Sequence, residues 1–173
     1  MILEKFSLNT ARTLKDANPS HPATLEEIAF SLTLIYSTLA TLTSVLVVGL
    51  LLGQTSQMLV VLFAFALLRA ISGGYHLQSA LGCVAATAAF TAVLSYSAYP
   101  LPVLMLLTAA SLLLIALYSP SNIEHQTRIP RKFHKLLKLF ALAIVASNAI
   151  IQSPLLASAF ALQSLLLIRR RRR

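Results

Sequence analysis

The stretch Arg69-Ala-Ile-Ser-Gly-Gly-Tyr-His-Leu-Gln-Ser-Ala-Leu-Gly-Cys83 interrupts a long series of apolar residues. It holds the only cysteine of the chain, with His76 seven residues before that cysteine and Gly73-Gly74 before the histidine. One cysteine with a nearby histidine is the minimum equipment for thiol catalysis. A glycine pair ends a helix readily, because glycine adopts turn conformations that other residues avoid. The stretch therefore separates two apolar segments and gathers the candidate chemistry of the chain.

The apolar segments on both sides of this stretch predict an integral membrane protein. Of the 173 residues, 57% are hydrophobic and only 11% are charged, whereas about a quarter of a soluble domain is charged. A membrane-crossing helix needs about 20 residues. We expect an all-α, polytopic helix bundle with about six spans, in which the short segments 56–68, 136–151 and 154–168 either lengthen into their flanks or span only partly. The six candidate segments are 28–52, 56–68, 79–98, 101–118, 136–151 and 154–168.

The charges predict how such a bundle is oriented. All 14 Lys and Arg residues lie in four places, namely 5–15, Arg69, 128–138 and 169–173. Six crossings put every charge on one side, and the positive-inside rule makes that side the cytosol, with both termini inside. A net charge of +9 would suggest nucleic acid in a soluble protein. Membrane orientation and attraction to anionic lipids explain it here, so we expect no nucleic-acid partner.

The same pattern predicts one integral membrane domain over residues 1–173. Residues 1–27 have the spacing of a weak amphipathic helix, which would lie on the cytosolic interface, although a floppy tail explains this segment equally well. Residues 28–168 form the expected bundle. Residues 169–173 are five consecutive arginines and form a basic tail.

Helix geometry restricts how His76 and Cys83 can cooperate. Seven residues of one α-helix rise about 10.5 Å, which is too far for a direct hydrogen bond. We therefore expect Gly73-Gly74 to end one helix and Ser79 to cap the next. Cys83 would then lie about one turn into that helix, near its positive end, which favours the thiolate. His76 would fold back from the loop as general base and later as general acid.

Each of these residues also has a simpler interpretation. Cys83 alone suits a small buried apolar position, and His76 alone suits a histidine bonded to backbone at the membrane interface. Arg69 fits a membrane-end anchor or a charge that stabilises an oxyanion or a carboxylate. Gly73 and Gly74 either mark a plain turn or let backbone approach a substrate. One cysteine with scattered histidines gives no recognisable metal-ligand set, so we expect neither metal nor cofactor.

The motif nevertheless resembles that of the accessory gene regulator B (AgrB) family, whose pattern is an Arg, a Gly-rich turn, a His and a Cys. Arg69, Gly74, His76 and Cys83 reproduce this pattern with its spacing, and Ser79 matches a frequent Ser of the intervening stretch. Two further segments look like family segments, so the resemblance extends over most of the chain. They are Tyr118-Ser119-Pro120-Ser121 with Arg128-Ile129-Pro130 downstream, and residues 27–32 at the start of the first span.

The resemblance implies a multi-pass cysteine endopeptidase of the bacterial cell membrane, with its active site facing the cytosol. Such proteins cleave a short amphipathic pheromone precursor on its C-terminal side and hold the N-terminal part as a thioester. A Cys or Ser of the peptide then closes a thiolactone or lactone ring for quorum sensing. Carried over, Cys83 is the nucleophile and His76 its base. Arg69, Gly73, Gly74, Ser79, Arg128 and Pro130 support the site or bind substrate, and a homodimer is implied.

The sequence departs from the family pattern at two places. Thr33 stands where the family often has Glu or Gln, which puts substrate recognition at that place in question. Residues 124–126 are Glu-His-Gln, where the family loop is usually rich in Lys. Two other functions stay open: a noncatalytic membrane transport or scaffold component, and an unrelated membrane acyltransferase that uses Cys83.

Overall fold

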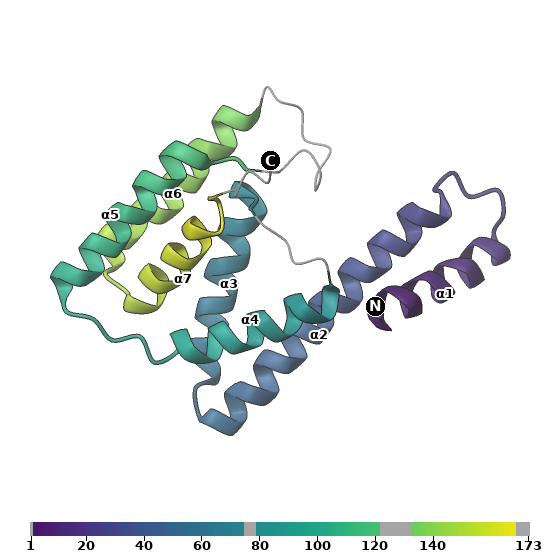
Figure 1. Cartoon of the computed structure of the whole chain (residues 1–173), viewed down its shortest axis with the longest axis horizontal. Helices are drawn as coiled ribbons and strands as arrows, with labels where there is room; N and C mark the ends of the chain where they lie inside the picture. Colours follow the sequence, from purple (N-terminus) through teal and green to yellow (C-terminus); the bar gives the residue numbers. More distant parts are fainter. Residues whose placement is uncertain (1, 75–78, 122–132, 169–173) are drawn as a thin grey trace. The chain divides into compact units, whose positions relative to one another are not determined.

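The computed structural model describes residues 2–74, 79–121 and 133–168. Within these ranges the chain forms helices and no strand, as the sequence predicts. Four helices, α2, α3, α5 and α6, are long and apolar enough to cross a membrane. In chain order the helices are α1 (Ile2–Ala17), α2 (Leu25–Leu52), α3 (Thr55–Ser72), α4 (Ala80–Leu94), α5 (Leu101–Tyr118), α6 (His134–Ile151) and α7 (Pro154–Leu165) (Figure 1).

The helices group into two compact units, each built from two separate pieces of sequence. One unit comprises residues 1–55 with 76–90, and the other comprises residues 56–75 with 91–173. The first unit therefore holds α1, α2 and most of α4. The second holds α3, the end of α4, and α5 to α7. Each unit has its own packing and is described by itself.

The helix lengths agree with the predicted segments in part. The short segments 56–68 and 136–151 lengthen into their flanks and become the 18-residue helices α3 and α6. The predicted segment 79–98 is too long, because α4 ends at Leu94 after 15 residues. At that end the Ser95 hydroxyl donates to the carbonyl oxygen of Ala92 at 2.7 Å. A hydroxyl bonded in this way competes with backbone amides for carbonyl oxygens, which disfavours continuation of the helix. The helix α7 has only 12 residues. The six-span count and the cytosolic termini stay predictions.

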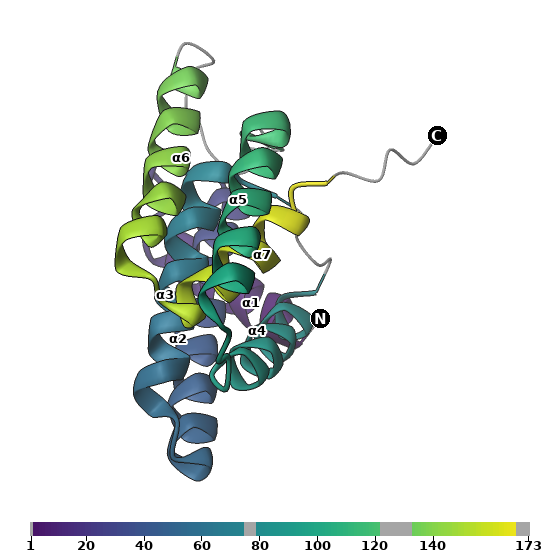
Figure 2. The same ribbon diagram turned by 90° about the vertical axis from the view of Figure 1, so that its left-hand side faces the viewer.

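In the first unit, α1 and α2 lie side by side and run in opposite directions (Figures 1 and 2). Their rings of Phe6 and Tyr36 pack with centroids 5.2 Å apart. The connecting loop is closed by the Lys15 ammonium group, which donates to the carbonyl oxygens of His21 at 2.6 Å and Ala23 at 3.1 Å. The helix α2 begins with a capping box formed by Thr24 and Glu27, which satisfies amides that its first turn would otherwise leave unpaired.

In the second unit, α5, α6 and α7 pack together, and small and polar side chains are buried there beside large apolar ones. Asn148 of α6 is fully buried. Its amide nitrogen donates to the Thr108 hydroxyl of α5 at 3.2 Å, and its amide oxygen accepts from the Ser153 backbone amide at 3.0 Å. Small residues allow helices to approach closely in a membrane, and buried polar groups join them by hydrogen bonds. The small buried residues of α7 are Ala157, Ser158, Ala159 and Ser164.

The connection between α4 and α5 is held to the start of α7 by hydroxyl groups. Ser158 of α7 donates to the Ser97 hydroxyl at 2.7 Å. The hydroxyls of Ser158 and Ser97 each lie 3.4 Å from the phenolic oxygen of Tyr99. These two hydroxyls, Ser158 foremost, lower the pKa of Tyr99 below its ordinary value. This network holds the segment between α4 and α5 against α7 within the second unit.

Candidate active site

The helix α3 ends at the glycine pair, as the sequence predicts. Its last residue is Ser72, and the Gly73 amide still donates to the carbonyl oxygen of Arg69 at 2.9 Å. Gly73 and Gly74 then take φ angles of 73° and 125°. Residues with a Cβ rarely adopt such angles, so the chain turns here at a place that favours glycine.

The turn pairs with the segment that follows α5. The Gly74 amide donates to the Ser121 carbonyl oxygen at 2.9 Å, and the Ser121 amide donates to the Ser72 carbonyl oxygen at 2.9 Å. These two bonds form an isolated parallel bridge between Gly73 and Ser121. Two motifs that the sequence analysis treated separately, the glycine pair and residues 118–121, are therefore joined by backbone.

A glutamine of α7 completes this contact, and the sequence analysis did not identify it. The amide nitrogen of Gln163 donates to the Gly73 carbonyl oxygen at 2.7 Å and to the Ser72 hydroxyl at 3.2 Å. Gln163 is fully buried. Its amide oxygen has no hydrogen-bond partner among the described residues. Gln163 is the only amide side chain of α7, and this was the available sequence signal, since buried amides need partners.

Gly74 also lies close to α7. A Cβ built on Gly74 would meet the Leu166 carbonyl oxygen at 3.3 Å and the Gln163 amide nitrogen at 3.4 Å. These distances are tighter than ordinary van der Waals contact, and the carbonyl belongs to backbone. Gly74 thus allows a close approach between two parts of the protein's own chain. We call the hydrogen-bonded group at this turn the glycine-turn knot; it consists of Ser72, Gly73, Gly74, Ser121 and Gln163.

Arg69 lies one turn before the glycine pair, on α3. Its guanidinium carbon lies 5.5 Å from the centre of the Phe65 ring, close enough for a cation–π interaction. The Arg69 side chain is half-buried, while Phe65 is buried. This placement holds the charged group at the end of α3, next to the turn. It is compatible with both interpretations, the membrane-end anchor and the stabilising charge.

The helix that carries Cys83 begins as the sequence predicts. The Ser79 hydroxyl accepts a hydrogen bond from the Gly82 amide at 3.2 Å, so Ser79 caps α4. Cys83 is the fourth residue of α4, and its amide donates to the Ser79 carbonyl oxygen at 3.0 Å. The thiol is free and half-buried. The polar row that continues its face is buried, with Thr87, Thr91 and Ser95 at most 8% exposed.

Several predicted site residues lie outside the described residues. They are His76, Arg128 and Pro130, and the predicted basic tail 169–173 lies outside the described residues as well. The described helices on either side of His76 end at Ser72 and begin at Ala80. Cooperation between His76 and Cys83 therefore stays a prediction. Within residues 2–74, 79–121 and 133–168, His, Cys, Asp and Glu side chains form no group that could hold a metal ion.

Four long apolar helices among the described residues indicate a helical membrane protein. One of them, α3, ends in the glycine turn, and the next helix, α4, is capped by Ser79 and carries Cys83. A family model described as Accessory gene regulator B, AgrB, matches residues 6–168. The chain therefore belongs to the AgrB family. It is 33% identical over 95 residues to an AgrB-like protein of Halalkalibacterium halodurans, a match that covers 55% of this chain and 48% of the relative. The chain thus spans about half the length of that relative, and no solved structure matches it.

Proposed function

We propose that this protein is a membrane cysteine endopeptidase that processes a short signal-peptide precursor for quorum sensing. Membership of the AgrB family supports the class of process. The observation that carries the chemistry is the place of Cys83, the only cysteine of the chain, four residues into α4 and behind the Ser79 cap. A cysteine thiol is a nucleophile that can form a covalent intermediate with a carbonyl group.

The proposed reaction uses one thiol and one base. His76 takes the proton of the Cys83 thiol, and the sulfur attacks the carbonyl carbon of one peptide bond of the precursor. The bond to nitrogen breaks, the released C-terminal fragment takes the proton from His76, and the N-terminal part stays on Cys83 as a thioester. A thiol of the precursor then attacks that carbonyl, closes a thiolactone ring and releases the Cys83 thiol. With a serine in place of that thiol, the product is a lactone.

The half-buried position of Cys83 suits this sequence of steps. A thioester must be shielded from bulk water long enough for the peptide thiol to capture it. The glycine-turn knot fixes the chain at Gly74, two residues before His76. Arg69 supplies positive charge at the same end of α3, and we propose that it stabilises an oxyanion or a substrate carboxylate. Arg128 and Pro130 are proposed to contact substrate.

We further propose a multi-pass protein of the bacterial cell membrane with about six spans and a cytosolic active site. The precursor would reach this site along the membrane surface as an amphipathic helix. The cationic segments at both ends of the chain would contact anionic lipids. A homodimer belongs to the same proposal.

The test coexpresses the full chain with the peptide of a neighbouring reading frame that has an amphipathic leader, a central Cys or Ser and an acidic tail. Mass spectrometry follows the released C-terminal fragment and the adduct on Cys83. The wild type should release the fragment, and neutral hydroxylamine should remove the adduct, as expected for a thioester. Cys83→Ala and His76→Ala should release none, whereas Thr38→Ala, at an exposed position of α2 outside the proposed machinery, should still cleave.

Unchanged cleavage by Cys83→Ala would sink the peptidase proposal and favour a noncatalytic transport or scaffold component. An adduct formed from acyl donors, with no peptide cleaved, would instead indicate an acyltransferase. Expression of every variant is compared by detergent extraction and size-exclusion profile, so that a missing product is not mistaken for missing protein.

A further inference from the structure

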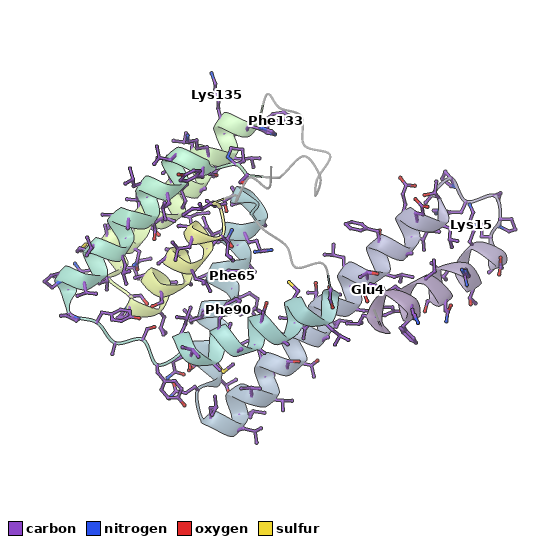
Figure 3. The ribbon with its side chains drawn as sticks, viewed as in Figure 1. Glu4, Lys15, Phe65, Phe90, Phe133 and Lys135 are labelled. Atoms are coloured by element: carbon purple, nitrogen blue, oxygen red, sulfur yellow. The ribbon has the colours of Figure 1, made fainter. Side chains whose placement is uncertain are left out.

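A carboxylate of the first helix of the chain reaches the helix that carries Cys83. The side-chain oxygen Oε1 of Glu4, on α1, accepts a hydrogen bond from the Ala80 backbone amide at 2.9 Å (Figure 3). The two residues are 76 positions apart in sequence. Ala80 is the first residue of α4, three positions before Cys83. Glu4 is therefore a cap supplied by another helix.

This contact complements the local cap of the same helix. The first amides of a helix have no partner inside it. Ser79 accepts from the Gly82 amide, and Glu4 accepts from the Ala80 amide. A carboxylate at the positive end of a helix forms a charge-assisted hydrogen bond, which is stronger than a neutral one. The start of α4 is thus held from two sides, by its own serine and by α1.

Glu4 is itself carried by a fixed element. The helix α1 packs along α2, where Phe6, two residues after Glu4, meets the Tyr36 ring at 5.2 Å. The Lys15 contacts to His21 and Ala23 close the loop between the two helices. The position of the Glu4 carboxylate therefore follows the α1–α2 pair, and through Ala80 so does the first turn of α4.

We propose that Glu4 is a positioning residue for the Cys83 thiol, and that α1 serves as a support for the nucleophile helix. This inference rests on the proposed function of Cys83 as the nucleophile. Glu4 acts through the Ala80 amide and touches no reacting atom. Loss of the contact would loosen the first turn of α4, so the half-buried thiol would become more accessible to small reagents and less well aimed at the precursor.

The test compares Glu4→Ala with Glu4→Gln in the full chain, because glutamine keeps an oxygen acceptor for the Ala80 amide. Glu26→Ala removes an exposed acid of the same unit and is the matched control. Two rates are measured in membranes: alkylation of Cys83 by N-ethylmaleimide, which reports one thiol because the chain has one cysteine, and turnover of precursor peptide added at a series of concentrations.

Glu4→Ala should alkylate several-fold faster than the wild type, while kcat falls about five- to tenfold and KM changes little. Glu4→Gln should stay within about threefold of the wild type in both rates, because it keeps the acceptor for the Ala80 amide. If the charge of Glu4 were the cause, Glu4→Gln would instead behave like Glu4→Ala. A thermal midpoint well above the assay temperature excludes unfolding as the cause. Alkylation and kcat of Glu4→Ala equal to those of Glu26→Ala would overturn the proposal.

A second variant removes the other partner of the hydrogen bond. Ala80→Pro deletes the amide that Glu4 binds, and proline is well tolerated at the first position of a helix. Adding Glu4→Ala to this variant should cause no further change in either rate if the two residues act together. Additive effects would contradict the proposal. If the wild type cleaves no precursor, the proposed function fails, yet the alkylation rates still decide whether Glu4 positions the thiol.

Discussion

The side-chain amide of Gln163 donates a hydrogen bond to the carbonyl oxygen of Gly73 at 2.7 Å. This bond ties α7 to the turn that follows α3, across 90 residues of sequence. The same amide lies 3.2 Å from the Ser72 hydroxyl. The turn that leads to His76 is therefore fixed by a buried side chain near the far end of the chain.

Gln163→Glu should destabilise the protein, because a carboxylate of the same shape has no proton to donate to Gly73. An unpaired buried acceptor costs about 1–3 kcal/mol, and we expect the thermal midpoint in detergent to fall by several degrees. Precursor cleavage should fall as well, since the turn comes two residues before His76 in the chain. Leu165→Met, at an exposed position of the same helix, is the control. Equal thermal midpoints for the two variants would show that the bond contributes nothing.

Gly74→Ala and Gly82→Ala should have opposite effects on stability. At Gly74 the φ angle is 125° and a Cβ would meet the Leu166 carbonyl oxygen at 3.3 Å, so alanine adds strain of about 1–3 kcal/mol. At Gly82, inside α4, a Cβ would meet only Ser79 atoms at 3.7 Å or more. Alanine there should stabilise the helix by about 0.5–1 kcal/mol. Thermal midpoints of the two variants check both signs, and a Gly74→Ala protein as stable as the wild type would contradict the argument.

Local signals in the sequence were sufficient for the boundaries around the site. The glycine pair predicts the end of α3, and Ser79 predicts the cap of α4, because turns and caps depend on a few neighbouring residues. Hydropathy alone misplaced the end of α4 at residue 98 instead of Leu94. Tyr96 and Ala98 keep the hydropathy of the segment high beyond the helix, but the backbone turns there, with the Ser97 amide bonded to the Leu94 carbonyl oxygen at 3.1 Å.

The long-range contacts could not be predicted in the same way. Gln163 signals a need for a partner, but nothing in its own segment indicates Gly73. Glu4 belongs to an amphipathic helix, where a charged residue is expected to face solvent or lipid headgroups, whereas the structure pairs it with the Ala80 amide. Both contacts depend on how distant helices pack, and a hydropathy pattern carries no information on which helices become neighbours.

The pair Asn148–Thr108 should contribute to the stability of the second unit by a measurable coupling energy. The two side chains are buried and lie 3.2 Å apart. Asn148→Ala, Thr108→Val and the double variant form a cycle that isolates their interaction. We expect a coupling of about 0.6 to 1.7 kcal/mol, the range found for hydrogen bonds between membrane helices. Asn148→Ala alone should cost more, because it also leaves the Ser153 amide without the acceptor that it has at 3.0 Å. Additive single effects would rule out the coupling.

Comparing Ser79→Ala with Ser79→Asp should show whether the start of α4 needs the serine itself or only a hydrogen-bond acceptor at this position. Alanine removes the acceptor of the Gly82 amide, which lies 3.2 Å from the serine hydroxyl, and should cost about 1 kcal/mol. For a chain of this size that corresponds to a loss of about 2–4 °C in thermal midpoint. Aspartate keeps an acceptor at the same place and should retain most of the stability.

The two Ser79 variants are compared by thermal shift in detergent, and also by the rate at which N-ethylmaleimide alkylates Cys83, which lies one turn into the same helix. Because the cap holds the first turn, alanine should raise that rate and aspartate should not. Equal rates for both variants would mean that the cap does not control access to the thiol.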